Sequence, residues 1–267
     1  MCCTRKPGRE METLIECRGV GFSYGPRRIL GDISLSFGEG SMHGILGANG
    51  AGKSTLLKLL TGALRPETGE VLYRGKPLRS LGQRDIARKV AYIPQDPVFA
   101  FPFTVSEVIL MGRAPNIGRF EFERESDIEM ACEAMETVGI PHLEKRLISE
   151  VSSGERQLAS IARALVQEPE VMILDEPATF LDIRHRSEIM NILKKLRDER
   201  GILIIAATHD IFGALYYFDE IIMLSEGRIF AEGEVGEVVT GENLSALYGT
   251  GVSVRKEDGK LFVYPGE

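Results

Sequence analysis

The sequence contains few cysteines: Cys2, Cys3, Cys17 and Cys132 are the only ones among its 267 residues. No two of them have the C-x-x-C spacing that is typical of zinc ligands, so we expect no zinc site. The adjacent Cys2 and Cys3 cannot form an ordinary disulfide with each other. We therefore interpret the cysteines as reduced thiols of a cytosolic protein.

Long hydrophobic runs are also absent. The longest uninterrupted apolar run covers residues 202–207, whereas a helix needs about 20 apolar residues to span a bilayer. The N-terminal sequence MCCTRKPGRE lacks the apolar core of a signal peptide. We therefore expect a chain that does not cross a membrane by itself.

Acidic residues outnumber basic residues, so the formal net charge of the chain is −7. Broad nucleic-acid binding requires a basic surface, so we expect no nucleic-acid partner. A local loop can still bind a nucleotide whatever the net charge is. We find no internal repeat and no heptad run that would indicate a coiled coil.

One stretch organises the rest of the chain, namely residues 42–60, MHGILGANGAGKSTLLKLL. It predicts an apolar strand, a glycine-rich turn and an amphipathic helix. The turn fits G-x-x-x-x-G-K-[ST], whose backbone N–H groups cradle the phosphates of a nucleoside triphosphate at the positive end of the following helix. We expect Lys53 to contact the outer phosphates and Ser54 to ligate Mg²⁺. The alternative is a plain glycine turn between a strand and a helix.

Two acidic residues end another apolar strand. Residues 171–174 are apolar, and Asp175 and Glu176 follow them. Ligands bind at the carboxyl edge of an open parallel sheet. We therefore expect Asp175 to hold Mg²⁺ and Glu176 to face a water that attacks the γ-phosphate. Burying two carboxylates together without a cation is costly, which disfavours a merely structural role.

Three further residues follow predicted strands. His209 comes after residues 202–206, and we expect its imidazole to bind the γ-phosphate and to hold the water and Glu176 in place. Gln95 follows the strand at 90–93, where its amide can ligate Mg²⁺ or orient a water, or merely cap a loop. Tyr24 follows a strand signal, where its ring can stack on adenine or be an ordinary turn tyrosine.

Between residues 96 and 150 the pattern changes from strands to helices, which we expect at 105–112, 126–138 and 143–148. This segment begins with three phenylalanines, Phe99, Phe101 and Phe103. They either form a docking groove or pack internally. Ser152 and Glu155 then form a capping box at the start of a helix that extends to about residue 167, and such a helix N-terminus can bind an anion.

The fold class that these patterns predict is α/β, a P-loop NTPase with a mixed central sheet, an antiparallel β layer and an inserted helical subdomain. We expect turns at Gly21, 25–26 and 38–40 in the antiparallel layer. The predicted divisions are a disordered lead at 1–12, an ATP-binding core at 13–95 and 151–240, a helical subdomain at 96–150, and a C-terminal hairpin tail at 241–267.

The motifs, in this order, resemble those of the ATP-binding cassette (ABC) ATPases over about residues 13–250. The resemblance identifies 47–55 as Walker A, 151–155 as the signature and 171–176 as Walker B. It implies catalytic roles for Glu176, His209 as the switch histidine, and Gln95 in the Q-loop, with Mg²⁺ held by Ser54, Gln95 and Asp175. The residues implied to bind ATP are Tyr24, Gly47, Asn49, Gly50, Gly52, Lys53, Ser54, Thr55, Ser152, Ser153, Gly154 and Asp182, the last in the D-loop.

The signature departs from the family pattern at one position. The family usually has Leu-Ser-Gly-Gly-Gln or -Glu, whereas this chain has Ser153 in place of the first glycine. We expect tolerance if the backbone at Ser153 is helical, because glycine is then not required. The alternative is a weaker or retuned closed state.

Within the family, residues 101–113 and the ending at 247–249 resemble importer ATPases for iron siderophores, haem and cobalamin. The resemblance implies a homodimer that binds two ATP molecules, a separate permease dimer, a substrate-binding protein that acts indirectly, and a place at the cytoplasmic face of the membrane. Molybdate or tungstate importers are the nearest alternative. An ABC ATPase of DNA repair or translation, or a nucleotide sensor without catalysis, is less well supported by these residues.

Overall fold

The computed structural model describes residues 12–97, 99, 101–118, 121–179, 181–258 and 260–266. At the centre of the structure, these residues form a mixed sheet of six strands in the order β10-β9-β3-β8-β7-β6. Every neighbouring pair is parallel except β9 and β10. The strands are β3 (Met42–Leu46), β6 (Val90–Ile93), β7 (Val171–Asp175), β8 (Leu203–Thr208), β9 (Glu220–Ser225) and β10 (Arg228–Glu234). The expected mixed sheet is confirmed.

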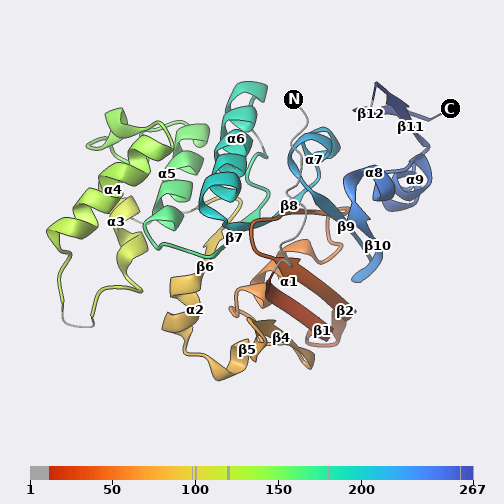
Figure 1. Cartoon of the computed structure of the whole chain (residues 1–267), viewed down its shortest axis with the longest axis horizontal. Coiled ribbons are helices and arrows are strands. Elements are labelled where there is room, and N and C mark those ends of the chain that lie inside the picture. Colours follow the sequence, from red (N-terminus) through yellow and green to blue (C-terminus); the bar gives the residue numbers. More distant parts are fainter. Residues whose placement is uncertain are drawn as a thin grey trace.

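An antiparallel layer covers one side of helix α1 (Lys53–Leu60), and the central sheet lies on the other side of that helix (Figure 1). The layer has the order β2-β1-β4-β5. Its strands are β1 (Thr13–Tyr24), β2 (Arg27–Gly38), β4 (Thr68–Tyr73) and β5 (Lys76–Pro77). The turn expected at Gly21 is wrong, because Gly21 lies inside β1 at a shift of register, where a Cβ would meet Thr68 Oγ1 at 2.5 Å. A glycine inside a strand often marks such a close approach.

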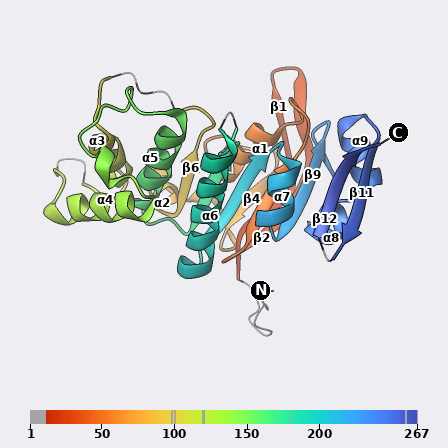
Figure 2. The same ribbon diagram turned by 90° about the horizontal axis from the view of Figure 1, so that it is seen from above.

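Helices cover the sheet and extend beyond its β6 end, where α3, α4 and α5 lie together (Figure 2). The remaining helices are α2 (Gln83–Lys89), α3 (Val105–Leu110), α4 (Glu125–Thr137), α5 (Ser153–Leu165), α6 (Ile183–Arg200), α7 (Ile211–Tyr217), α8 (Val235–Val238) and α9 (Gly241–Tyr248), with 3₁₀ turns η1 (Leu78–Ser80), η2 (Met111–Arg113) and η3 (Pro141–Leu143). The hairpin of β11 (Val252–Glu257) and β12 (Lys260–Pro265) ends the described chain.

The helix expected at 143–148 is wrong. The chain instead forms the short turn η3 and then runs beside the start of α3. Val105 donates its N–H to the carbonyl of Arg146 at 2.9 Å, and Ile148 donates to the carbonyl of Phe103 at 2.9 Å. These long-range partners satisfy the backbone groups that a helix would have paired internally. The sequence did not lead us to expect helices α7, α8 and α9. Residues 1–11, which belong to the predicted disordered lead, lie outside the described part of the chain.

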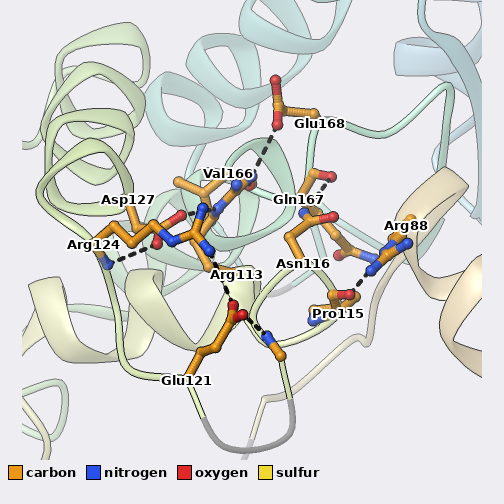
Figure 3. A network of polar contacts seen from close by, with 11 residues as sticks. Arg88, Arg113, Pro115, Asn116, Glu121, Arg124, Asp127, Val166, Gln167 and Glu168 are labelled. Carbon is orange, nitrogen blue, oxygen red and sulfur yellow. Dashed lines mark hydrogen bonds and ion pairs between the residues drawn. The ribbon is translucent and has the colours of Figure 1, made fainter.

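Arg113 ties the helical segment together (Figure 3). Its Nε donates to Asp127 Oδ1 on α4 at 2.7 Å, and its Nη1 donates to the carbonyl of Val166, just beyond α5, at 2.7 Å. The side chains of Arg113 and Asp127 are only 11% and 6% exposed. The pair is therefore a buried ion pair that joins η2, α4 and the end of α5.

We expect Arg113→Ala to lower the free energy of unfolding by about 3–5 kcal/mol, because Asp127 would remain buried without its cation. Arg124→Ala is the matched control, since the Arg124 side chain is 71% exposed in its pair with Glu121. The control should change stability by less than about 1 kcal/mol. Denaturant unfolding measures both variants, and equal midpoints for Arg113→Ala and Arg124→Ala would contradict the prediction.

Candidate functional site

The loop predicted to bind phosphates passes from β3 into α1 through two glycines with left-handed backbones, Gly50 at φ +81° and Gly52 at φ +106°. Gly47 approaches β9 so closely that a Cβ would meet the carbonyl oxygen of Leu224 at 2.5 Å. Among the described residues, no side chain caps the N-terminus of α1, and no acidic residue lies in its first turn. The first N–H groups of α1 are thus available to an anion.

Lys53 is held inside this loop. The residue is 6% exposed, and its Nζ donates to the carbonyl oxygen of Gly47 at 2.8 Å and to that of Ala48 at 3.3 Å. Its Nζ also lies 3.8 Å from Glu176 Oε1. The loop carbonyls and Glu176 therefore fix the ammonium group next to the uncapped helix end.

Glu176 is the centre of a polar cluster at the carboxyl ends of β6, β7 and β8. Its Oε2 accepts hydrogen bonds from Gln95 Nε2 at 3.1 Å and Thr179 Oγ1 at 3.0 Å, and lies 3.2 Å from His209 Nδ1. Glu176 also has a positive φ of +49°, which is uncommon for a residue with a side chain and is often found at functional sites. The structure thus brings Gln95, Glu176 and His209 together, and adds Thr179, which the sequence motifs did not indicate.

Asp175 lies beside this cluster and is 7% exposed. Tyr92 donates its hydroxyl to Asp175 Oδ2 at 3.3 Å, and burial together with the charge of Asp175 raises the pKa of Tyr92. Because Gln95 uses its Nε2 on Glu176, its carbonyl oxygen is left for another ligand. One carboxylate, one amide oxygen and the Ser54 hydroxyl are hard oxygen donors, and such a set suits Mg²⁺ bound together with phosphates.

Two neighbouring cavities open on this site. One, of about 360 Å³, is lined by Arg27, Ile29, Asn49, Gly50, Gly52, Lys53, Ser54, Thr55, Gln95 and Glu176. The other, of about 640 Å³, is lined by Gly47, Ala48, Asn49, Gln95, Glu176, Thr179, His209 and Tyr248. Arg27 and Tyr248 are lining residues to which sequence reasoning gave no role in the site. Arg27 lies in no recognisable motif, and the resemblance at 247–249 indicated only the importer group.

The other predicted ATP-binding residues line neither cavity. Tyr24 is 50% exposed at the end of β1, opposite Arg27 in register. Asp182 caps α6 by accepting the N–H of His185 at 2.9 Å, which lowers the pKa of its carboxyl. A single chain thus assembles the Walker motifs, Gln95 and His209 around these cavities, whereas Tyr24 and Asp182 line neither. Of the signature, Ser153 lines a separate cavity together with Gln95 and Thr179.

The signature residues begin helix α5. Ser152 is the N-cap, its Oγ accepts the N–H of Glu155 at 3.3 Å, and the backbone N–H of Ser152 donates to the Glu155 carboxylate, which lowers the pKa of Glu155. Ser153 is the first residue of α5, so its backbone is helical. This is the condition under which we expect serine to be tolerated in place of glycine. Gly154 lies against α6, where a Cβ would meet the ring of His185 at 2.8 Å.

Residues 30–179, more than half of the chain, match the family model described as ABC transporter. The chain belongs to the ABC transporter family. It is 36% identical to the hemin import ATP-binding protein HmuV of Bordetella avium over 93% of this chain and 98% of that protein. It is 34% identical to the ferric enterobactin transport ATP-binding protein FepC of Escherichia coli over 89% of both chains. It is also 34% identical to the cobalamin import ATP-binding protein BtuD of Halobacterium salinarum over 90% of this chain, which spans 60% of that relative.

Solved structures of ABC cassettes share the fold. A metal-chelate type ABC transporter in an inward-facing conformation superposes with a TM-score of 0.83 and 26% identity, over 94% of this chain and 96% of that one. A dimeric ATP-binding cassette bound to ADP and phosphate has a TM-score of 0.73 and 25% identity, over 83% of this chain and 99% of that one. In the part of the chain that the structure describes, none of the helices combines the length and apolarity needed to span a bilayer.

Proposed function

We propose that this chain is the ATP-hydrolysing subunit of an importer that takes up a metal chelate, namely an iron siderophore, haem or cobalamin, through a separate permease. The observation that carries the proposal is the Glu176 cluster beside Lys53 and the uncapped end of α1. The import functions in the names of HmuV, FepC and BtuD support the cargo class.

In the proposed reaction the N–H groups of residues 47–55 and the Lys53 ammonium bind the phosphates of ATP. Ser54, Gln95 and Asp175 would hold Mg²⁺, which neutralises phosphate charge. Glu176 accepts the proton of the attacking water, and Gln95 and Thr179 orient its carboxylate through their hydrogen bonds to Oε2. His209, on the other side of Glu176, is placed to bind the γ-phosphate.

We further propose that two copies of the chain complete each ATP site. Walker A binds one side of the phosphates, whereas Ser152, Ser153 and Gly154 lie at the start of α5 and line neither cavity at the phosphate loop. A second copy, related by a two-fold axis, supplies its signature helix and Asp182 to the open side, while Tyr24 stacks on adenine. The dimeric state of the similar cassette bound to ADP and phosphate supports this arrangement.

We assign the helical segment 96–150 as the docking subdomain on a core of 13–95 and 151–240, with 241–267 as a tail. Phe99 and Phe103 are packed against the hydrophobic core, so internal packing holds for these two, and Val98 and Ala100 lie outside the described residues. Phe101 is 66% exposed, and Phe122 is 87% exposed. These rings are the proposed contact for the permease at the cytoplasmic face of the membrane, with the substrate-binding protein reached indirectly through the permease.

We expect Phe101→Asp to reduce co-purification with the membrane fraction at least tenfold when the permease is co-expressed, because a charge would be buried in the interface. Phe230→Asp is the control, since Phe230 is 42% exposed on β10, at the opposite end of the sheet. The folding of both variants is checked by circular dichroism. Unchanged membrane association of a folded Phe101→Asp variant would contradict the docking assignment.

A further inference from the structure

Buried polar atoms without a partner gather near the His209 turn. Within the described residues, only three buried side-chain nitrogen or oxygen atoms make no hydrogen bond: Gln157 Nε2, Arg186 Nε and the Tyr248 hydroxyl. Arg186 is paired through its Nη1 with Asp210 Oδ2 at 3.1 Å. Burial and then the charge of Asp210 raise the pKa of Tyr248. One of the three unpartnered atoms therefore belongs to a side chain that pairs with Asp210, and another belongs to a tyrosine that lines the same cavity as the neighbouring His209.

Asp210 directly follows His209 and is the N-cap residue of α7. Its carbonyl accepts the N–H of Ala214 at 3.0 Å, and its own N–H donates to Thr208 Oγ1 at 3.0 Å. Among the described residues, no donor bonds to its Oδ1. His209 is thus followed directly by a residue whose carboxylate can accept one more hydrogen bond.

Tyr248 reaches this place from the C-terminal part of the chain. It is the last residue of α9, which ends at Gly249 with φ +65°. Figure 1 shows α9 beyond the β9–β10 side of the sheet. Tyr248 contributes to the wall of the larger cavity together with Glu176, Thr179 and His209, although its hydroxyl oxygen is fully covered.

We propose that Tyr248 is a positioning residue for ATP hydrolysis, whose hydroxyl donates a hydrogen bond to Asp210 and so fixes the His209 turn as bound ATP reaches the transition state. This inference rests on the proposed ATPase site. A buried hydroxyl without a partner destabilises the state that contains it, whereas a phenol that donates to a carboxylate makes a strong bond. A movement that brings the two together at that step therefore stabilises the transition state. A bond that forms only on the path to the transition state raises kcat rather than lowering KM.

The test is Tyr248→Phe in the full chain, with turnover of Mg²⁺-ATP and thermal unfolding without nucleotide as the two readouts. We expect kcat to fall about tenfold, with KM changed by less than about twofold. We expect the melting temperature to rise by about 2–4 °C, because an unpartnered polar atom is removed. The control is Tyr73→Phe, which removes a hydroxyl that donates to Glu170 Oε2 at 2.6 Å, and which should lower the melting temperature and leave kcat unchanged.

The partner is tested in an Asp210→Asn background, where loss of the Tyr248 hydroxyl should change kcat by less than about twofold. The proposal is overturned if Tyr248→Phe keeps the wild-type kcat, if it lowers the melting temperature as Tyr73→Phe does, or if its tenfold effect persists in Asp210→Asn. A wild-type chain without ATPase activity would instead refute the proposed function. Wild-type activity that Tyr248→Phe fully retains refutes this inference alone.

Discussion

Glu176→Gln is expected to lower ATP turnover at least a hundredfold, because the amide cannot accept the proton of the attacking water. Glutamine has nearly the same size as glutamate and keeps one side-chain oxygen. Gln95 and Thr179 can therefore still donate hydrogen bonds to the side chain at position 176. Binding of ATP to the loop and Lys53 should be retained. The variant is therefore expected to accumulate as an ATP-bound dimer, which size-exclusion chromatography with light scattering detects.

The matched control is Glu188→Gln, on an exposed position of α6. It removes the same charge at a position that lines neither cavity of the site and should leave turnover within about twofold. A Glu176→Gln variant with wild-type turnover would refute the assignment of Glu176 as general base. A variant that loses turnover but also fails to bind ATP would show that Glu176 acts mainly in binding.

The assembly of Gln95, Asp175, Glu176 and His209 was predictable because each residue follows an apolar strand. Parallel strands present their carboxyl ends at one edge of the sheet, and β6, β7 and β8 are consecutive neighbours in the sheet order. The strand pattern is therefore enough to predict that these residues lie together, and the loops between them are not needed for this prediction. The P-loop was predictable for a local reason, since its glycines adopt the positive φ values that the turn requires.

Other features depend on contacts between distant segments. The resemblance at 247–249 gave Tyr248 no role in the site, and the packing of α9 against β9 brings it to the wall of the cavity that His209 also lines. The segment 143–148 was expected to be a helix, but its backbone pairs with residues before and within α3. Local pattern does not reveal such long-range pairing, which also explains why Arg27 was missed. Thr179 is only three residues from Glu176, but no motif indicated a role for its hydroxyl.

The second large effect is expected at Lys53 and Ser152. Lys53→Ala removes the charge beside Glu176 and the uncapped end of α1, and should lower turnover at least a hundredfold through loss of ATP binding. Ser152→Asp keeps a residue type that caps α5 well, so the fold should persist. Its carboxylate would repel the phosphates bound by the partner copy, and turnover should again fall at least a hundredfold. Lys58→Ala, at an exposed position of α1, should have no effect.

The most direct measurement mixes these two inactive variants in equal amounts and follows phosphate release. If each site takes Lys53 from one copy and Ser152 from the other, a mixed dimer holds one intact site, and random pairing should restore about a quarter of wild-type turnover. The same mixture made with the Lys53→Ala, Ser152→Asp double variant and either single variant should restore none. Failure of the two single variants to complement each other, or full activity of a monomeric Ser152→Asp chain, would contradict the shared site.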